Sequence, residues 1–297
     1  MDRIGIVGTG VMGLAMAGHL LEAGYEVHGF DVVPEKTEEL TRIGGISESS
    51  GTHLAKRSDV LLLSLPSVAA LEAATSDIAR GAHDGLLALE MGTLPIEAKQ
   101  QSRQALAAVG VELMDVPVSG TGLQAADASL VIFASGSPAA FERVAPILSV
   151  IGRSTHFMGD FGNGSIMKYI ANLLVAIHNL SSAEAHALGI AAGMDPEVVQ
   201  RVMSDGVGAS KIFDIRGPMM VADVYDPPAA RLSILLKDTR IIKAFAEEVG
   251  APTPLLDAAI PVYEQSEAQG LGDLDAAALC RYLEQRAGLQ RPPKRHQ

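Results

Sequence analysis

Lys168 and Asn172 are the two side chains whose types and spacing point most directly to chemistry. They lie four residues apart in a mostly apolar stretch, residues 165–192, so a helix would place both on one face. A buried lysine is costly unless it is paired or used, and burial lowers its pKa, so that the neutral amine can accept a proton. An amide one turn away can orient a substrate oxygen without adding charge. The pair therefore suggests acid–base catalysis; the alternative is a lysine that reaches the surface beside a capping asparagine.

A glycine motif at the start of the chain gives a second chemical signal. Gly8, Gly10 and Gly13 have the spacing G-x-G-x-x-G, after an apolar run and at the beginning of a helical stretch. In a dinucleotide-binding turn the first glycine permits the tight turn, the second lets the backbone approach a pyrophosphate, and the third lets helix and strand pack closely. The helix then starts at Val11 and Met12, and its free N–H groups face the phosphates. A purely structural strand-to-helix turn is the alternative.

Asp31 ends the next apolar run, 23 residues after Gly8, where a carboxylate accepts hydrogen bonds from an adenosine ribose. A carboxylate repels a 2′-phosphate, and the three residues after Asp31 include no arginine. Lys36 is close in the sequence but would have to reach past Asp31. We therefore expect NAD rather than NADP as cofactor. FAD binds to the same kind of turn and is a lesser alternative, because the second half of the chain has no evident flavin-specific feature.

The stretch DVPVSG begins at Asp115 and ends a strand-like run in Ser119 and Gly120. The backbone N–H groups of these two residues and the Ser119 hydroxyl could hold a substrate carboxylate. An ordinary turn from a strand into a loop is the alternative. These signals are far apart in the sequence, so they can act together only if the fold brings them to one place.

Short apolar runs alternate with helical stretches through the first half of the chain. The expected strands are residues 3–8, 26–31, 59–66, 86–92, 111–118, 129–136 and 154–159. Helices such as 12–23 and 96–109 lie between them. Runs that are apolar throughout suit strands covered on both faces, so the pattern predicts a doubly wound, mostly parallel sheet in an α/β Rossmann-type domain.

After about residue 161 the pattern changes, and no good strand follows. The expected helices are residues 165–192, 196–203, 229–249, 254–269 and 275–286. We predict two domains, a cofactor-binding domain at 1–162 and an all-α domain for substrate binding and dimerisation at 163–297. The glycine-rich stretch 204–220 lies between helices. Either it is a simple connecting loop or its Lys211 and Phe213 line the substrate pocket.

Composition limits the class of protein. The chain has 297 residues, of which 48% are hydrophobic, enough for two domains with a sizeable core. A net charge of -12 argues against nucleic-acid binding, because no broad basic surface can meet phosphates. Cys280 is the only cysteine and the histidines lack metal-ligand spacing, so we expect no metal site. Since neither a secretory leader nor a membrane-length apolar run is visible, we expect a cytoplasmic protein without a membrane partner.

Four stretches, in this order, resemble the β-hydroxyacid dehydrogenase family, which includes 3-hydroxyisobutyrate dehydrogenases and tartronate semialdehyde reductases. They are GIVGTGVMGLAMAGHL from Gly5, DVPVSGTGLQAA from Asp115, GNGSIMKYIANLL from Gly162 and KDTRII from Lys237. Many dehydrogenases share the first stretch, but the combination is much more specific. The family is composed of oxidoreductases with an amino-terminal Rossmann domain and a helical second domain.

The resemblance implies a role for several residues. Lys168 would be the catalytic acid or base, with Asn172 beside it on the catalytic helix. Lys237 would reach the nicotinamide end of the cofactor, and Asp238 would lie near the catalytic lysine at the substrate. Where the family often has a second asparagine, just before Asn172, this chain has Ala171.

Further residues are implied around the cofactor and the substrate. The stretch EMGTLP resembles the loop that places a threonine near the nicotinamide, which is Thr93 here. The stretch SLPS puts Leu65 and Pro66 where a loop covers the cofactor. In the substrate segment the family usually has glycine where this chain has Thr121 and Gln124. Thr121 would still lie at the substrate, but these two departures suggest a reshaped rim.

Together these observations predict reversible, NAD-dependent oxidation of a small β-hydroxy acid to its semialdehyde or ketone. Lys168 would move the proton, Asn172 would orient the reacting oxygen, and Ser119, Gly120 and Thr121 would hold the substrate. The family resemblance also implies a homodimer or homotetramer formed through the helical part. Two alternatives remain. One is an imine reductase-like enzyme, a class that generally lacks a lysine at this helix position. The other is a catalytically silent NAD-binding protein.

Overall fold

The computed structural model describes residues 2–289 and 291. It divides into two units, residues 1–169 and 170–297, which are described separately here. In the first unit, six strands form one parallel sheet with the order β3-β2-β1-β4-β5-β6. The strands are β1 Ile4–Val7, β2 Val27–Phe30, β3 Ile46–Ser47, β4 Val60–Leu63, β5 Leu87–Glu90 and β6 Glu112–Asp115. The strand order reverses between β1 and β4, which is where a doubly wound sheet binds its ligands, at the carboxyl ends of the strands. The predicted Rossmann-type fold is confirmed.

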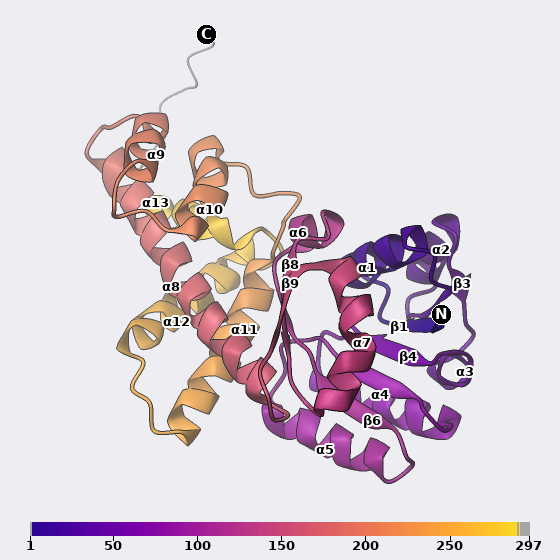
Figure 1. Cartoon of the computed structure of the whole chain (residues 1–297). Coiled ribbons are helices and arrows are strands. Elements are labelled where there is room, and N and C mark those ends of the chain that lie inside the picture. Colours follow the sequence, from indigo (N-terminus) through magenta and orange to yellow (C-terminus); the bar gives the residue numbers. More distant parts are fainter. Residues whose placement is uncertain (1, 290, 292–297) are drawn as a thin grey trace. The chain divides into compact units, whose positions relative to one another are not determined.

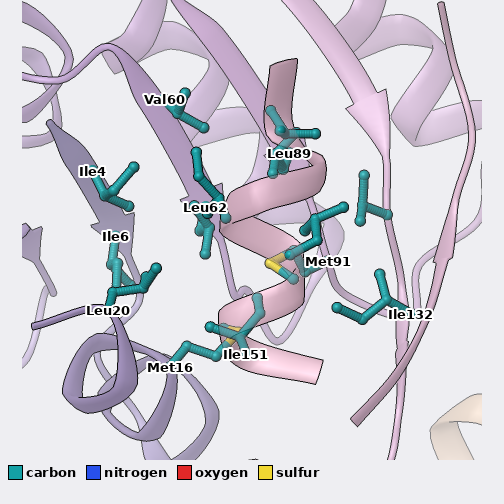
Figure 2. Packing of buried hydrophobic residues seen from close by; sticks show 14 of the residues in the cluster. Ile4, Ile6, Met16, Leu20, Val60, Leu62, Leu89, Met91, Ile132 and Ile151 are labelled. Carbon is teal, nitrogen blue, oxygen red and sulfur yellow. The ribbon is translucent and has the colours of Figure 1, made fainter. Parts of the chain in front are cut away.

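Helices cover both faces of this sheet (Figure 1). They are α1 Val11–Glu22, α2 Pro34–Arg42, α3 Gly51–Arg57, α4 Val68–Gly81, α5 Ile96–Ala107 and α7 Pro138–Ile151. Strand β4 is apolar throughout because both of its faces are covered. Val60 and Leu62 pack with α1 and α7, while Leu61 and Leu63 pack with α3, α4 and α5. Figure 2 shows the first of these cores, with Met16 and Leu20 of α1 among its side chains.

The last strands of the first unit form a separate small sheet, which differs from the prediction. Its strands are β7 Val118–Ser119, β8 Leu130–Ala134 and β9 Gly152–Phe157, with the short helix α6 Gly122–Ala126 between β7 and β8. Strand β7 is antiparallel to β8, and β8 is parallel to β9. The run 111–118, predicted as one strand, is two strands in different sheets, β6 and β7. Pro117 lies at the break, and proline cannot donate the N–H bond that a continuous strand needs.

The second unit is helical, as predicted. Its α-helices are most of α8 Asn163–Ala191, then α9 Pro196–Ser204, α10 Lys211–Ala222, α11 Leu232–Glu248, α12 Pro254–Ser266 and α13 Leu279–Arg286. A π-helical segment at Glu267–Leu271 and a 3-10 segment at Ala276–Ala278 connect the last two. Although α8 has 29 residues, no helix among the described residues is both long and apolar enough to cross a membrane.

The stretch 204–220 is mostly helix rather than loop, which corrects the prediction. The Ser210 hydroxyl accepts a hydrogen bond from the backbone N–H of Phe213 and so starts α10 at Lys211. Lys211 is exposed, whereas Phe213 is buried and stacks on His186 of α8, with ring centroids 5.0 Å apart. The glycines misled the prediction because the capping serine that follows them is the stronger local signal.

Candidate active site

The three glycines of the β1–α1 turn have different structural requirements. Gly8 has φ +89°, and a β-carbon there would collide with the Ser64 carbonyl oxygen. A β-carbon on Gly13 would collide with the carbonyl oxygen of Gly8. Gly10, in contrast, has φ -68°, and a β-carbon there would meet no atom of the protein within 4 Å. The fold therefore requires glycine at the first and third positions only, and the second glycine fits the close approach of a ligand.

The start of α1 can hold an anion. No side chain caps this helix, and its first turn contains no acidic residue. The first intrahelical bond to the cap residue runs from Leu14 N to Gly10 O. The N–H groups of Val11 and Met12 precede that bond, and the positive end of the helix dipole lies with them. These features fit the pyrophosphate of a dinucleotide.

Asp31 lies against the glycine turn. One carboxylate oxygen, Oδ2, accepts a hydrogen bond from the backbone N–H of Thr9 at 2.9 Å, and Oδ1 accepts one from Val33 N–H at 2.9 Å. These two hydrogen bonds fix the carboxylate at the carboxyl end of β2. The nearby cation Lys36 forms an ion pair with Glu39, with Nζ 3.1 Å from Oε2. Asp31 and Lys36 therefore each have a partner of their own in this structure.

The other residues expected at the cofactor lie on loops at the same edge of the sheet. Leu65 follows β4, and its side chain lies beside Gly8 while its carbonyl oxygen lies beside Gly92. Thr93 follows Gly92 and is partly buried, whereas Pro66 is exposed. The first unit thus brings together the turns after β1, β2, β4 and β5. The contacts of Pro66 and Thr93 with the cofactor stay predictions.

The expected substrate segment also lies at this edge. Ser119 ends β7, and Gly120 has φ +148°, so that glycine is favoured there. The short helix α6 follows, and a β-carbon on its Gly122 would lie 2.7 Å from a methyl group of Val11. His19 of α1 also contacts α6, with Nε2 2.9 Å from the Ala126 carbonyl oxygen. The segment that carries Ser119 is therefore packed against the helix that starts at the glycine turn.

Helix α8 carries Lys168 and Asn172 one turn apart, as predicted. Both are buried, with 8% and 7% of their surface exposed. The amide Nδ2 of Asn172 donates a 2.7 Å hydrogen bond to Asp238 Oδ2 of α11. The other oxygen of Asp238 lies 3.0 Å from the ammonium nitrogen of Lys237. The second unit therefore brings together Asn172, Lys237 and Asp238, three of the residues expected at the site.

A fully buried ion cluster was missed by the sequence analysis. The ammonium of Lys99, on α5, lies 2.5 Å from Glu90 Oε2 and 2.8 Å from Asp115 Oδ1. Burial alone would lower the pKa of Lys99, but the attraction of the two carboxylates outweighs it and raises this pKa. Burial raises the pKa of Glu90. A signal was present: Lys99 has helical spacing with Ser102 and Leu106, which form the buried face of α5.

Two family models match this chain, one in each half. Residues 3–159, more than half of the chain, match the family model described as the NAD binding domain of 6-phosphogluconate dehydrogenase. Residues 162–283 match the model described as NAD-binding of NADP-dependent 3-hydroxyisobutyrate dehydrogenase. The chain belongs to the β-hydroxyacid dehydrogenase family. It is therefore an oxidoreductase with a nicotinamide cofactor, of the kind that acts on CH–OH groups.

Relatives in the β-hydroxyacid dehydrogenase family match the chain over nearly its whole length. L-threonate dehydrogenase from Cupriavidus necator is 30% identical over 296 residues, and the match covers 98% of each chain. Glyoxylate/succinic semialdehyde reductase 2 from Arabidopsis thaliana is 30% identical over 287 residues, covering 94% of this chain and 79% of the relative. The crystal structure of 3-hydroxyisobutyrate dehydrogenase from Salmonella typhimurium has a TM-score of 0.88 at 29% identity, covering 95% and 100% of the two chains.

Two residues at which this chain departs from the pattern expected for its family, Thr121 and Gln124, form hydrogen bonds with each other. Gln124 Oε1 accepts hydrogen bonds from the backbone N–H and the hydroxyl of Thr121, at 2.8 and 2.7 Å. The Thr121 hydroxyl in turn accepts from Leu123 N–H, which completes a capping box at the start of α6. Threonine and glutamine therefore form one unit that orders the segment after Gly120.

Proposed function

We propose that this protein interconverts a small β-hydroxy acid and its semialdehyde or ketone, with NAD as the preferred cofactor. The observation that carries the proposal is the pair Lys168 and Asn172, buried one turn apart on α8, with Asp238 bonded to the amide of Asn172. Such a pair offers one group that exchanges a proton and one that fixes an oxygen atom. The relatives include a semialdehyde reductase and a dehydrogenase of the hydroxy acid L-threonate, which supports the same substrate class.

Lys168 acts as the general base in oxidation and as the general acid in reduction. Its neutral amine takes the proton of the substrate hydroxyl, and its ammonium returns a proton to the carbonyl oxygen. Because α8 holds this side chain in a buried position, water competes little for the same proton. The nicotinamide cofactor, when bound, accepts the hydride in oxidation and supplies it in reduction.

Asn172 orients the reacting oxygen. One hydrogen of its amide nitrogen is used by Asp238, which fixes the plane of the amide and leaves the second hydrogen for a substrate oxygen. Asp238 is 5% exposed and also pairs with Lys237, so it positions both side chains at once. Lys237 is in turn the cation that we assign to the nicotinamide end of the cofactor.

The Ser119 hydroxyl and the Gly120 N–H bind the substrate carboxylate in this proposal. The Thr121 N–H and hydroxyl are already bonded to Gln124, so Thr121 contributes to the rim chiefly through the order it gives to α6. The cofactor is held by Gly8, Gly10, Val11, Met12 and Gly13 at the pyrophosphate and by Asp31 at the ribose. Leu65, Pro66 and Thr93 line its nicotinamide half.

A substrate panel tests the proposal directly. The purified protein is incubated with NAD or NADP and with small β-hydroxy acids that differ in the substituents beyond the carboxylate. We expect NADH formation, followed by its absorbance, with at least one acid and more slowly with NADP. The same acids esterified at the carboxylate serve as controls and should not react. If NAD binds but neither an acid with NAD nor the corresponding semialdehyde with NADH reacts, the proposal is wrong, and oxidation of NADH or NADPH by a cyclic imine would support an imine reductase-like function instead.

The preference for NAD is expected to depend on the charge of Asp31. Asp31→Asn keeps an acceptor for one of the two backbone N–H groups but removes the charge that repels a 2′-phosphate. We expect the ratio of kcat/KM for NAD to kcat/KM for NADP to fall at least about tenfold, equivalent to about 1.4 kcal/mol. Glu35→Gln, an exposed carboxylate in the first turn of α2, is the matched control and should leave the ratio unchanged. If Asp31→Asn leaves this ratio as unchanged as Glu35→Gln does, the assignment of Asp31 to the ribose of the cofactor is wrong.

We also infer that the protein forms a homodimer or homotetramer through its helical unit. Ile170, Leu174 and Leu188 are spaced at helical intervals along α8, and 49%, 49% and 72% of their surface is exposed. Exposed apolar side chains on one helix favour contact with another protein surface. Sedimentation velocity measures the oligomeric state, and a monomer at micromolar concentration would contradict this inference.

A further inference from the structure

We propose that Lys99 is a positioning residue for the reaction. It anchors the first turn of α8, the helix that carries Lys168, to the loop that carries Thr93. The proposal rests on the proposed function, in which Lys168 moves the proton. Lys99 lies in α5 and does not itself belong to the expected cofactor or substrate residues. Every contact that carries the argument lies within the first unit.

The ammonium of Lys99 joins segments that are far apart in the sequence. Besides Glu90 and Asp115, it donates 2.8 Å hydrogen bonds to the carbonyl oxygen of Gly92 and to the hydroxyl of Ser165. Gly92 directly precedes Thr93, and Ser165 lies in the first turn of α8. Lys99, Glu90 and Asp115 have no exposed surface, so water does not compete for these bonds. One side chain thus fixes the loop after β5 and the start of α8 at the same time.

Asp115 completes the attachment of α8. Its Oδ2 accepts a 2.8 Å hydrogen bond from the backbone N–H of Ser165, and its Oδ1 accepts one of 2.8 Å from the Ser165 hydroxyl. The neighbouring N–H of Gly164 is bonded to the hydroxyl of Ser135, which also contacts Asp115. Asp115 therefore caps α8 from a separate strand, and a carboxylate is favourable at the positive end of a helix. Lys99 holds this carboxylate in place.

The attachment determines where Lys168 lies. Ser165 precedes Lys168 by three residues, so both are on adjacent turns of the same helix face. A rotation or shift of the first turn would be carried directly to the ammonium of Lys168. Misplacement of a reacting group by about 1 Å can cost about a hundredfold in rate. The hydrogen bonds that hold the start of α8 therefore determine whether Lys168 is placed correctly for proton transfer.

Stability alone does not account for this cluster. Two carboxylates and one ammonium without solvent are expensive to bury, and well-packed apolar side chains of similar volume are often as stable. Apolar side chains do not form directional bonds, whereas each hydrogen bond of Lys99 fixes the distance between two segments. Those segments carry Thr93 and Lys168, and the proposed reaction requires that both residues are accurately placed.

Ser165→Ala tests the proposal. The variant removes the hydroxyl that links Lys99 to α8 but keeps the Lys99 ion pairs, whereas Lys99→Met would leave two buried carboxylates without a cation and is expected to unfold. Ser58→Ala is the matched control, because Ser58 is also fully buried and donates one 2.8 Å bond, to Leu54 O, in another part of the fold. We expect Ser165→Ala to lower kcat about tenfold, with KM for NAD and its calorimetric Kd within twofold, and Ser58→Ala to leave kcat within twofold.

A second readout does not depend on turnover. Hydrogen–deuterium exchange of the backbone amides of residues 163–168 should become at least about tenfold faster in Ser165→Ala and should be unchanged in Ser58→Ala. Unchanged exchange in this segment would overturn the anchoring, and faster exchange with an unchanged kcat would overturn its importance for the reaction. If the wild type turns over no hydroxy acid while exchange responds as expected, the proposed function fails and the positioning role for that reaction fails with it, but the anchor itself stands.

Discussion

Replacing Lys168 with alanine is expected to lower kcat by a factor of about 10² to 10⁴, the range that a positioned general acid or base contributes. The affinity for NAD should change less than about twofold, since no residue of the glycine turn is altered. Loss of the amine leaves the substrate hydroxyl without a base on α8, whereas Asn172 and Asp238 keep their mutual hydrogen bond. Steady-state NADH formation gives kcat, and calorimetric titration gives the NAD affinity.

Two further variants make the Lys168 result specific. Lys168→Met retains most of the buried stem but carries no proton, so it should be as slow as alanine if the amine is the essential group. Lys56→Ala, at an exposed position of α3, is the control for the loss of one positive charge and should have the wild-type kcat. Substantial turnover in Lys168→Met, with correct folding by circular dichroism, would rule out a role for Lys168 in proton transfer.

The fold could be predicted wherever a segment is defined by its own residues. Strand β4 is apolar at four successive positions because each face of the sheet is covered, and this is visible in the sequence alone. The long apolar stretch that forms α8 was equally clear. The run 111–118 was predicted incorrectly: Pro117 marked the break within it, but the sequence did not show that β6 pairs with β5 while β7 pairs with β8. Pairing between distant strands is not a local property, so a local pattern does not reveal it.

The residues of the candidate site also divide into those with a local signal in the sequence and those that only the fold brings together. The glycine turn and the spacing of Lys168 and Asn172 are local signals, and the structure places them in the expected elements. The bond between Asn172 and Asp238 joins residues 66 positions apart, so only the fold reveals it. The ion cluster of Lys99 was missed for a related reason. A lysine on a helix is ordinarily interpreted as exposed, and its partners come from the ends of two separate strands.

Thr121 and Gln124 are an intermediate case. Their departure from the expected glycines was evident in the sequence, but their direct pairing was not. A capping box is a local motif, with a threonine followed three residues later by a glutamine, so it could have been found from spacing alone. It was overlooked because α6 has only five residues and lacks helical periodicity. The two substitutions compensate for each other: two glycines would have left the backbone flexible, and the box orders it.

Replacing Gly10 with alanine should separate the fold from cofactor binding. A β-carbon at this position meets no protein atom within 4 Å and the backbone has a negative φ, so the chain itself tolerates alanine. The expected loss of stability is at most about 1 kcal/mol, the cost of alanine at a helix N-cap. If a pyrophosphate approaches this backbone, the methyl group occupies its place. We therefore expect the Kd for NAD, measured by calorimetric titration, to rise at least about tenfold while the thermal unfolding temperature changes little.

Gly18→Ala is the matched control for Gly10→Ala. Gly18 lies in the same helix, and a β-carbon there also meets no atom within 4 Å, but the position is two turns away from the glycine turn. Alanine inside a helix should stabilise the protein by about 1 kcal/mol and leave the NAD affinity unchanged. A small effect on NAD affinity in both variants would show that Gly10 is not a contact of the cofactor, since the fold gives no other reason for glycine there. A large effect in Gly10→Ala alone would assign the second glycine to the ligand and the first and third to the fold.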